Sequence, residues 1–184
     1  MITNKQTSFN VLDKYKDLPL EEIQRISAST KLPFAVAMVN IFGDLNCGFI
    51  IRTSECLGAE KVFIFGKRKW DRRSAVGSNN YIPVDATATE IDPFDWDSTL
   101  QSIRVNGYYP VVVEQGGKPI EDFKPVEYGK PCLIFGSEDM GIPQSICETE
   151  ICYSIPQVGV LRSLNVASAA AIAIYKVSTV LSAK

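Results

Sequence analysis

Short apolar runs alternate along this chain with segments whose apolar residues recur at helical spacing. Uninterrupted apolar runs of about four to eight residues are typical of strands buried on both faces of a parallel sheet, and alternation with helices is typical of α/β folds. The predicted strands are 33–40, 62–65, 108–114, 131–135 and 151–155. The predicted helices are 19–29, 46–58, 96–106, a short one beginning near Pro143, and 163–181.

The predicted organisation is one main domain with a short extension before it. A length of 184 residues suits a single α/β core, and the sequence has no internal repeat or low-complexity linker. We therefore expect residues 1–30 to form an N-terminal helical extension and residues 31–184 to form the main domain.

Composition limits where the protein is expected in the cell and whether it is expected to bind a metal. The net charge is −2 and the apolar content is 46%, both ordinary for a soluble protein. The chain begins without an apolar leader and has no run of about 18 apolar residues, so we expect a cytoplasmic protein with no membrane contact. The five cysteines form no C-x-x-C pair, which favours reduced thiols and no metal.

Two absences exclude whole classes of enzyme. The chain contains no histidine, which rules out a Ser-His-Asp triad, an H-E-x-x-H zinc site and a histidine general base. The segment after the first predicted strand reads NIFGDLNCG, which lacks the G-x-G-x-x-G pattern, and no phosphate-binding P-loop pattern occurs. An ordinary Rossmann dehydrogenase and a P-loop NTPase are therefore disfavoured despite the α/β pattern.

A first candidate motif, Asn46 with Arg52, follows the first predicted strand. The carboxyl ends of the strands are where open α/β sheets bind ligands. If Asn46 is the N-cap of the next helix, the two side chains can converge. Alternatively, Asn46 serves only as a cap and Arg52 forms a surface ion pair with Glu55.

Two further motifs stand at the ends of later strands. The segment from Gly136 to Gly141 reads GSEDMG, and its glycines would allow a ligand to approach the backbone; the alternative is a tight turn with solvated acids. The segment from Ile155 reads IPQVGVLRSLN and leads into the last predicted helix. There, Ser163 or Asn165 could be simply an N-cap.

A basic cluster surrounds a tryptophan in the segment GKRKWDRRS, whereas the rest of the chain is acidic on balance. Basic side chains beside an aromatic ring suit phosphate contacts and base stacking, although a run of charges is often only a solvated surface. We interpret the cluster as an RNA-binding segment. Its residues are Lys67, Arg68, Lys69, Trp70, Arg72 and Arg73.

In this order, the motifs resemble those of the SpoU/TrmH family of RNA ribose 2′-O-methyltransferases, within the SPOUT superfamily, over about residues 33–181. Asp139 stands where the family often has glycine, and Gln157 where it often has methionine. The matching residues are Asn46, Arg52, Gly136, Glu138, Gly141, Ile155, Pro156, Ser163, Leu164 and Asn165.

This resemblance implies a Rossmann-like parallel sheet with a deep C-terminal trefoil knot, a homodimer, S-adenosylmethionine as cofactor, and tRNA or rRNA as substrate. It implies cofactor binding by Val113, Glu114, Gly136, Ile155, Ser163 and Leu164. It implies catalytic roles for Arg52, Asn46, Glu138, Ser163 and Asn165. Because the chain lacks the extra N-terminal RNA-binding domain of some ribosomal RNA enzymes of the family, tRNA is favoured.

The resemblance makes Arg52 the central residue, and the chemistry of methyl transfer limits the role that it can have. The sulfonium methyl is already activated, so the reaction needs in-line positioning more than covalent assistance. A guanidinium, with a pKa above about 12, is a poor base. We therefore expect Arg52 to clamp a phosphate and stabilise the developing alkoxide. Glu138 would hold Arg52 or shape the pocket, while Asn46, Ser163 and Asn165 would orient the ribose and Arg52.

Alternatives remain at this point. The alanine-rich last helix presents small residues that the family's dimer would use at its interface, or that are buried within the monomer. A non-catalytic RNA-binding module on the same knotted fold is the main functional alternative. A methyltransferase acting on something other than RNA, or another α/β enzyme using a nucleotide, is the second.

Overall fold

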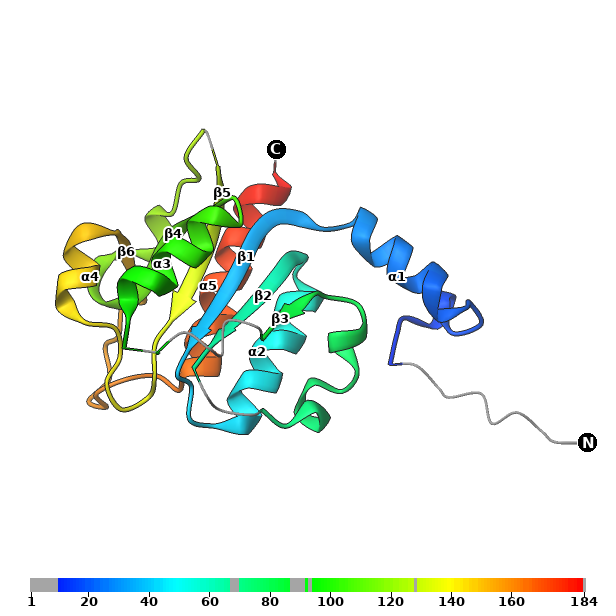
Figure 1. Ribbon diagram of the computed structural model, residues 1–184, viewed down its shortest axis with the longest axis horizontal. Helices are drawn as coiled ribbons and strands as arrows, with labels where there is room; N and C mark the ends of the chain where they lie inside the picture. Colours follow the sequence, from blue (N-terminus) through cyan, green and yellow to red (C-terminus); the bar gives the residue numbers. More distant parts are fainter. Residues whose placement is uncertain (1–9, 67–69, 87–91, 93, 128, 184) are drawn as a thin grey trace, which may run out of the picture.

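The centre of the molecule is a parallel sheet (Figure 1). The computed structural model describes residues 10–66, 70–86, 92, 94–127 and 129–183. Within them the strands lie in the order β3-β2-β1-β5-β4-β6, and every neighbouring pair is parallel, as predicted. The strands are β1 (Leu32–Val39), β2 (Ala59–Phe65), β3 (Val84–Asp85), β4 (Tyr108–Pro119), β5 (Lys130–Phe135) and β6 (Ile151–Ser154).

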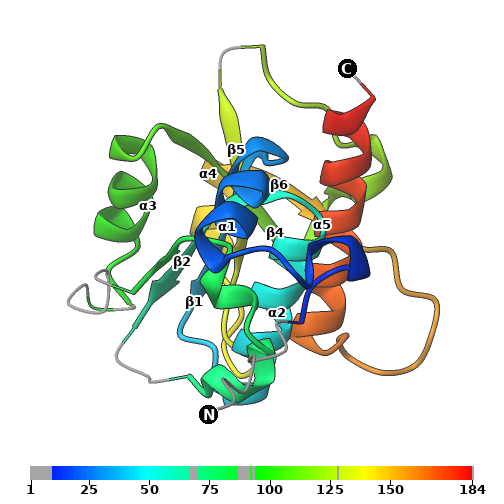
Figure 2. The ribbon, with the colours of Figure 1, turned by 90° about the vertical axis from the view of Figure 1, so that its right-hand side faces the viewer.

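Helices cover both faces of this sheet (Figure 2). α2 and α5 pack on one face and contact each other, whereas α3 and α4 pack on the other. The α-helices of the described residues are α1 (Leu20–Ser29), α2 (Asp44–Cys56), α3 (Trp96–Val105), α4 (Gln144–Thr149) and α5 (Val166–Ser182). All were predicted, although α2 begins at 44 rather than 46 and α5 at 166 rather than 163.

The apolar runs are continuous because the strands are buried on both faces. In β1, Phe34, Val36 and Met38 join the core beneath α2 and α5. The intervening Ala35 and Ala37 join the core beneath α3. Successive strand residues point to opposite faces, so a strand covered twice must be apolar at every position.

Two features of the sheet were not predicted. β3 has only two residues, which is too short to give a periodic pattern. β4 continues to Pro119 instead of ending near 114, and its pairing with β6 shifts register between Val113 and Lys118. Gly116 lies within this irregularity at φ 85°, a backbone conformation that favours glycine.

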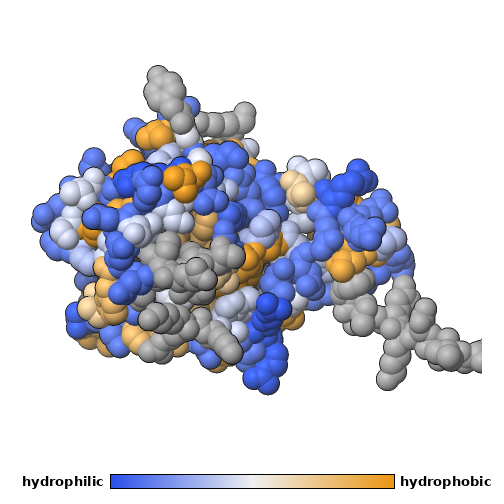
Figure 3. Space-filling model, in the orientation of Figure 1, coloured by the Kyte–Doolittle hydropathy of each residue, from blue (hydrophilic) through white to orange (hydrophobic). Residues whose placement is uncertain are grey.

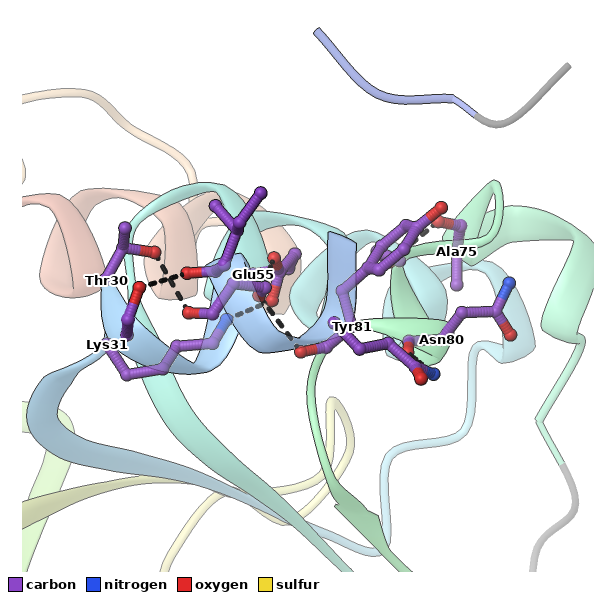
Figure 4. A network of polar contacts seen from close by, with 11 residues as sticks. Thr30, Lys31, Glu55, Ala75, Asn80 and Tyr81 are labelled. Carbon is purple, nitrogen blue, oxygen red and sulfur yellow. Dashed lines mark hydrogen bonds and ion pairs between the residues drawn. The ribbon is translucent and has the colours of Figure 1, made fainter. Parts of the chain in front are cut away.

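The N-terminal helix α1 is joined to the domain by a polar network (Figure 4). Lys31, at the end of the α1–β1 connection, forms an ion pair with Glu55 on α2. The Ser27 hydroxyl lies 2.9 Å from Glu55 Oε1 and 3.1 Å from the carbonyl of Tyr81. Residues 1–9 of the predicted extension lie outside the described residues, and the division near residue 30 stays a prediction.

The surface of the molecule is mainly polar on the side drawn in Figure 3, where hydrophobic residues are scattered between hydrophilic ones. Within the part of the chain that the structure describes, no helix combines the length and apolar character needed to cross a membrane.

Gly48 allows α2 to pack directly against the segment that follows β2. A Cβ atom at this position would overlap Ser74 Oγ and lie 2.7 Å from the backbone nitrogen of Ala75. We expect Gly48→Ala to lower the free energy of unfolding by about 1–3 kcal/mol, because both contacting groups are buried and cannot move aside. Urea unfolding measures this loss.

The matched control is Cys56→Ala, at an exposed position of the same helix, which should change stability little. Equal stability of Gly48→Ala and the parent protein would contradict the close packing.

Candidate active site

A cavity of about 620 Å³ opens beside the middle of β4 and beyond the carboxyl ends of β5 and β6. Its walls come from residues 113–115 within β4, from the segment after β5 and from the segment after β6. The carboxyl ends of the strands are the usual ligand position in an open α/β sheet. All six residues predicted to bind the cofactor line it, and so do Glu138 and Asn165. The structure therefore brings together the second and third sequence motifs.

The segment after β5 folds back as a tight turn whose closure requires glycine. The Gly141 N–H donates to the carbonyl of Ser137 at 2.8 Å, and Gly141 has φ 63°. A Cβ on Gly136 would lie 2.5 Å from the Gly141 carbonyl oxygen. Across the turn, the Glu114 carboxylate accepts from the Ile142 N–H at 2.9 Å. Glu114 thus fixes the turn against β4.

Glu138 accepts hydrogen bonds from the segment that leads into α2. Its Oε2 accepts from the Phe42 N–H at 2.8 Å. Its Oε1 accepts from Asn46 Nδ2 at 2.7 Å and from the Gly43 N–H at 3.3 Å. Two of these donors are backbone groups at the start of a helix, where a carboxylate is favoured by unpaired N–H groups and by the helix dipole.

Asn165 extends this chain of hydrogen bonds to α5. Its Oδ1 accepts from the Ala167 N–H at 2.9 Å, so Asn165 is the N-cap of α5, one of the two possibilities left by the sequence. Its Nδ2 donates to Asn46 Oδ1 at 3.2 Å. The hydrogen bonds Glu138–Asn46–Asn165 therefore connect all three motifs.

The predicted role of Asn46 as an N-cap is wrong. α2 begins at Asp44 with Gly43 as its N-cap, so Asn46 lies inside the first turn. From there its carboxamide bridges Glu138 and Asn165. The last helix likewise begins after Asn165, and Ser163 lies in the preceding loop as an exposed residue of the cavity wall.

Arg52 is exposed on α2 and does not line the cavity. Among the residues that the structure describes, it has no hydrogen bond or ion pair, and the alternative pairing with Glu55 is not present because Glu55 pairs with Lys31. Glu138 does not hold Arg52 either, since its carboxylate is bonded to the α2 entry segment. Of the two predicted roles for Glu138, shaping the pocket fits this geometry.

Cys47 lies next to Asn46 on α2, but its thiol is not suited to act as a nucleophile. Burial raises the pKa of Cys47 to about 12, and the negative charges of Glu138 and Asp44 act in the same direction. The thiolate is the reactive form, so this side chain is inert at neutral pH.

In the described part of the basic cluster, two of the residues predicted to bind RNA have contacts within the protein. Asp71 accepts from Arg73 Nε at 3.0 Å and from Arg73 Nη2 at 2.7 Å, and this pairing lowers the pKa of the Asp71 carboxyl. Trp70 is half-buried against the core beneath α2. Arg72 is exposed. Lys67, Arg68 and Lys69 lie outside the described residues.

Several residues of the cavity were not among the predicted site residues, although some of them lie within the predicted motifs. Gln115 reaches across it, and its Nε2 donates to the carbonyl of Arg162 at 2.7 Å, which links β4 to the loop before α5. No sequence pattern marks such a contact, because one partner is a backbone group. The other additional lining residues are Phe135, Ser137, Asp139, Met140, Gly141, Ile142, Gln144, Gln157, Val166 and Ala169. Within the described residues, no group of three or more side chains suited to hold a metal ion is found.

The pKa of Glu138 gives a test of its hydrogen bonds. Burial alone would raise this pKa, but the bonds from Phe42, Asn46 and Gly43 together lower it below its ordinary value of 4.5. A carboxyl with a lowered pKa stabilises the fold above its unfolded-state pKa, and this contribution is lost as the pH falls through the folded-state pKa. Glu138→Gln should therefore reduce stability above pH 4.5 and make less difference in acid.

Urea unfolding of the parent and of Glu138→Gln between about pH 7 and about pH 3 measures this convergence. Glu121→Gln, at an exposed carboxylate, is the control and should follow the parent at every pH. A stability difference for Glu138→Gln that does not change with pH would show that the ionised carboxylate is not what the hydrogen bonds stabilise.

Residues 33–175 match the SpoU rRNA Methylase family. An uncharacterized tRNA/rRNA methyltransferase of Mycoplasma genitalium is 28% identical over 94% of this chain and 72% of its own length. The tRNA (guanosine(18)-2′-O)-methyltransferase of Escherichia coli is 28% identical over 77% of this chain. The chain spans 61% of that relative's length.

Solved structures share the fold. The A. aeolicus TrmH/SpoU tRNA modifying enzyme superposes with a TM-score of 0.70 over 88% of this chain and 81% of its own, at 21% identity. The SpoU methyltransferase AviRb of Streptomyces viridochromogenes, in complex with AdoMet, gives a TM-score of 0.64 over 84% of this chain and 60% of its own, at 23% identity.

The family match extends from β1 into α5, so it contains every residue of the hydrogen-bonded chain from Glu138 through Asn46 to Asn165. The predicted resemblance is confirmed, and this chain belongs to the SpoU family of RNA methyltransferases.

Proposed function

We propose that this protein transfers a methyl group from S-adenosylmethionine to a ribose 2′-hydroxyl of tRNA or rRNA. The observation that carries the proposal is the joining of a ligand-sized cavity to the motif residues: Glu138 and Asn165 line the cavity, and Asn46 bonds to both. The relative from Escherichia coli is named for 2′-O-methylation of a tRNA guanosine, which makes tRNA our preferred substrate.

The cavity has features that fit S-adenosylmethionine. Its volume of about 620 Å³ lies within the range of small-molecule sites. The absence of a side chain at Gly136 leaves the turn after β5 open to close backbone approach. The carboxylate of Glu114 and the hydroxyl of Ser163 are polar groups of the wall, and Val113, Ile155 and Leu164 are apolar ones. When bound, this cofactor supplies an electrophilic methyl group.

The side chains around the cavity orient the acceptor. The carboxamide of Asn46 is held at both ends, by Glu138 and by Asn165, so its orientation is fixed before any substrate binds. A fixed polar group can position a ribose without losing entropy at the moment of reaction. The Arg52 guanidinium, exposed and without a partner among the described residues, is available to bind the adjacent phosphate and to stabilise the alkoxide.

The chain after β5 would form the C-terminal trefoil knot that the family resemblance implies. After β6, at the edge of the sheet, the chain passes through the loop of residues 155–165 and returns as α5. α5 then contacts α2, β1 and β5 near the middle of the sheet. A return of this kind, beside the turn at 136–142, supports the knot.

A homodimer is the proposed assembly, but the alanines of α5 are not its main support. Ala170 and Ala173 are buried within the monomer, in agreement with the alternative for this helix. The outer surface of the paired helices instead exposes Leu45, Phe49, Ile172 and Tyr175. Exposed apolar side chains on two helices that pack against each other are a candidate interaction surface. Sedimentation equilibrium measures the association. Since the described structure contains five free cysteines, we propose the reducing cytoplasm as its location.

The experiment that tests the function is transfer of labelled methyl from S-adenosylmethionine to total RNA from cells lacking this protein, followed by nucleoside mass spectrometry. A single 2′-O-methylated nucleoside is the expected product. Calorimetry with S-adenosylmethionine runs in parallel. Absence of both transfer and cofactor binding would overturn the proposal in favour of a non-catalytic RNA-binding module.

A further inference from the structure

A second cavity lies on the β3 side of the sheet, between α1 and the segment 79–86. Its volume is about 750 Å³, and it shares no lining residue with the cavity of the candidate active site. Lys31 and Glu60, near the amino ends of β1 and β2, form part of its wall. The two cavities are therefore separate sites.

The lining of the second cavity combines three kinds of group. Trp70 and Tyr81 supply aromatic rings, and Asn79 and Asn80 supply carboxamides. Arg72 supplies a guanidinium. An aromatic ring stacks on any nucleobase, a carboxamide donates and accepts at the edge of a base, and a guanidinium binds phosphate. Together these groups suit one nucleotide that is not stacked on its neighbours.

Among the described residues that line the cavity, Arg72 is the cation without a partner. The Glu60 carboxylate is paired with Lys130 at 2.7 Å and accepts from the Tyr108 hydroxyl at 2.6 Å. Lys31 is paired with Glu55. Arg72, by contrast, is exposed and has no hydrogen bond or ion pair within the described part of the chain. An anion entering this cavity would therefore find Arg72 as its counter-charge.

The walls of the cavity are held in place by contacts between distant segments. Gln24 on α1 donates through its Nε2 to the carbonyl of Asn80 at 2.9 Å. The Ser27 hydroxyl lies close to the carbonyl of Tyr81 (Figure 4). These bonds attach the N-terminal helix to the segment that carries two of the lining side chains. The site is thus formed before a ligand binds, which lowers the entropy cost of binding.

We propose that this second cavity binds one unstacked nucleotide. Where the protein acts on RNA, as in the proposed function, the nucleotide is part of the substrate strand and lies away from the methylated ribose. A free nucleoside monophosphate presents the same chemistry. The site gives α1 a function in addition to packing: it supplies Gln24 and Ala28 to the cavity wall.

Trp70 provides a direct measurement of binding. The chain has two tryptophans, Trp70 and Trp96, so Trp96→Phe leaves Trp70 as the single reporter. In this background, short single-stranded RNA oligonucleotides of mixed sequence and adenosine monophosphate are titrated while the fluorescence is followed. Base stacking on Trp70 should quench it to saturation. Stronger binding of the oligonucleotide assigns the site to RNA, and equal binding of both assigns it to free nucleotides.

Two variants and a control decide whether the cavity is responsible. Arg72→Ala and Tyr81→Ala should each weaken binding about tenfold, the size expected for one phosphate contact or one stacked base. Arg104→Ala, which removes an arginine from α3 on the other face of the sheet, should leave binding unchanged. Thermal melting verifies that each variant is folded.

No quenching by either ligand, or unchanged affinity in both cavity variants, would overturn the proposal. This outcome is independent of methyl transfer, because the titration contains no S-adenosylmethionine and follows only the fluorescence of Trp70. A protein that methylates RNA but shows no quenching would therefore disprove the second site alone.

Discussion

Replacing Arg52 by alanine should reduce methyl transfer to RNA by about 10²- to 10³-fold, the range seen when one group that stabilises a developing oxyanion is removed. Binding of S-adenosylmethionine should be unchanged, because Arg52 does not line the cavity. The fold should also be unchanged, because the side chain is exposed and has no partner among the described residues. Single-turnover transfer and calorimetry on the same preparation measure both quantities.

Arg52→Lys separates charge from geometry. Lysine keeps the positive charge but cannot form two parallel hydrogen bonds with a phosphate. We expect this variant to remain strongly impaired. Turnover close to that of the parent would contradict the bidentate clamp, whereas normal transfer by Arg52→Ala would remove Arg52 from the reaction altogether. Arg104→Ala, which removes an exposed arginine from α3, is the charge-matched control.

Gly136→Ala should lower the affinity for S-adenosylmethionine by more than about tenfold. The added Cβ would lie 2.5 Å from the Gly141 carbonyl oxygen and 2.7 Å from Ile142 Cγ1. Either the turn moves into the cavity or it loses its hydrogen bond to Glu114, and each change alters the wall. Calorimetric titration measures the affinity, and urea unfolding measures the accompanying loss of stability.

Gly159→Ala is the matched control, since nothing lies within 4 Å of a Cβ at that position. It should bind the cofactor as the parent does. Normal affinity in Gly136→Ala would show that the turn after β5 adapts to a side chain, and would assign cofactor binding to other parts of the cavity.

Most of the sheet and helices could be predicted because their signals are local. The run from Phe34 to Val39 is apolar at every position, which only a strand covered on both faces requires. The predicted helix 46–58 ends at Gly58, which stands just after the observed end of α2. Its φ of 80° is the conformation expected of a glycine that terminates a helix. The predicted cofactor residues lie together at one cavity, and their binding of the cofactor stays a prediction.

The connections within the site were not predictable in the same way. Asn46 has partners 92 and 119 positions away, and its place inside α2 rather than before it depends on them. Glu138 is held by the backbone N–H groups of Phe42 and Gly43, and every residue other than proline carries such a donor. From residue types alone, one predicted role of Glu138 was to hold Arg52. In the structure its carboxylate is bonded to other partners.

The sequence by itself determined the alternation of strands and helices and the set of polar residues at the ends of strands, because these depend on neighbouring positions and on residue chemistry. Only the tertiary structure decided which of those residues meet. It leaves Arg52 on the surface, joins Asn46 to Glu138 and Asn165, and uses Asp71 to neutralise Arg73. Such contacts depend on the folded path of the backbone, which brings remote donors and acceptors within hydrogen-bonding distance.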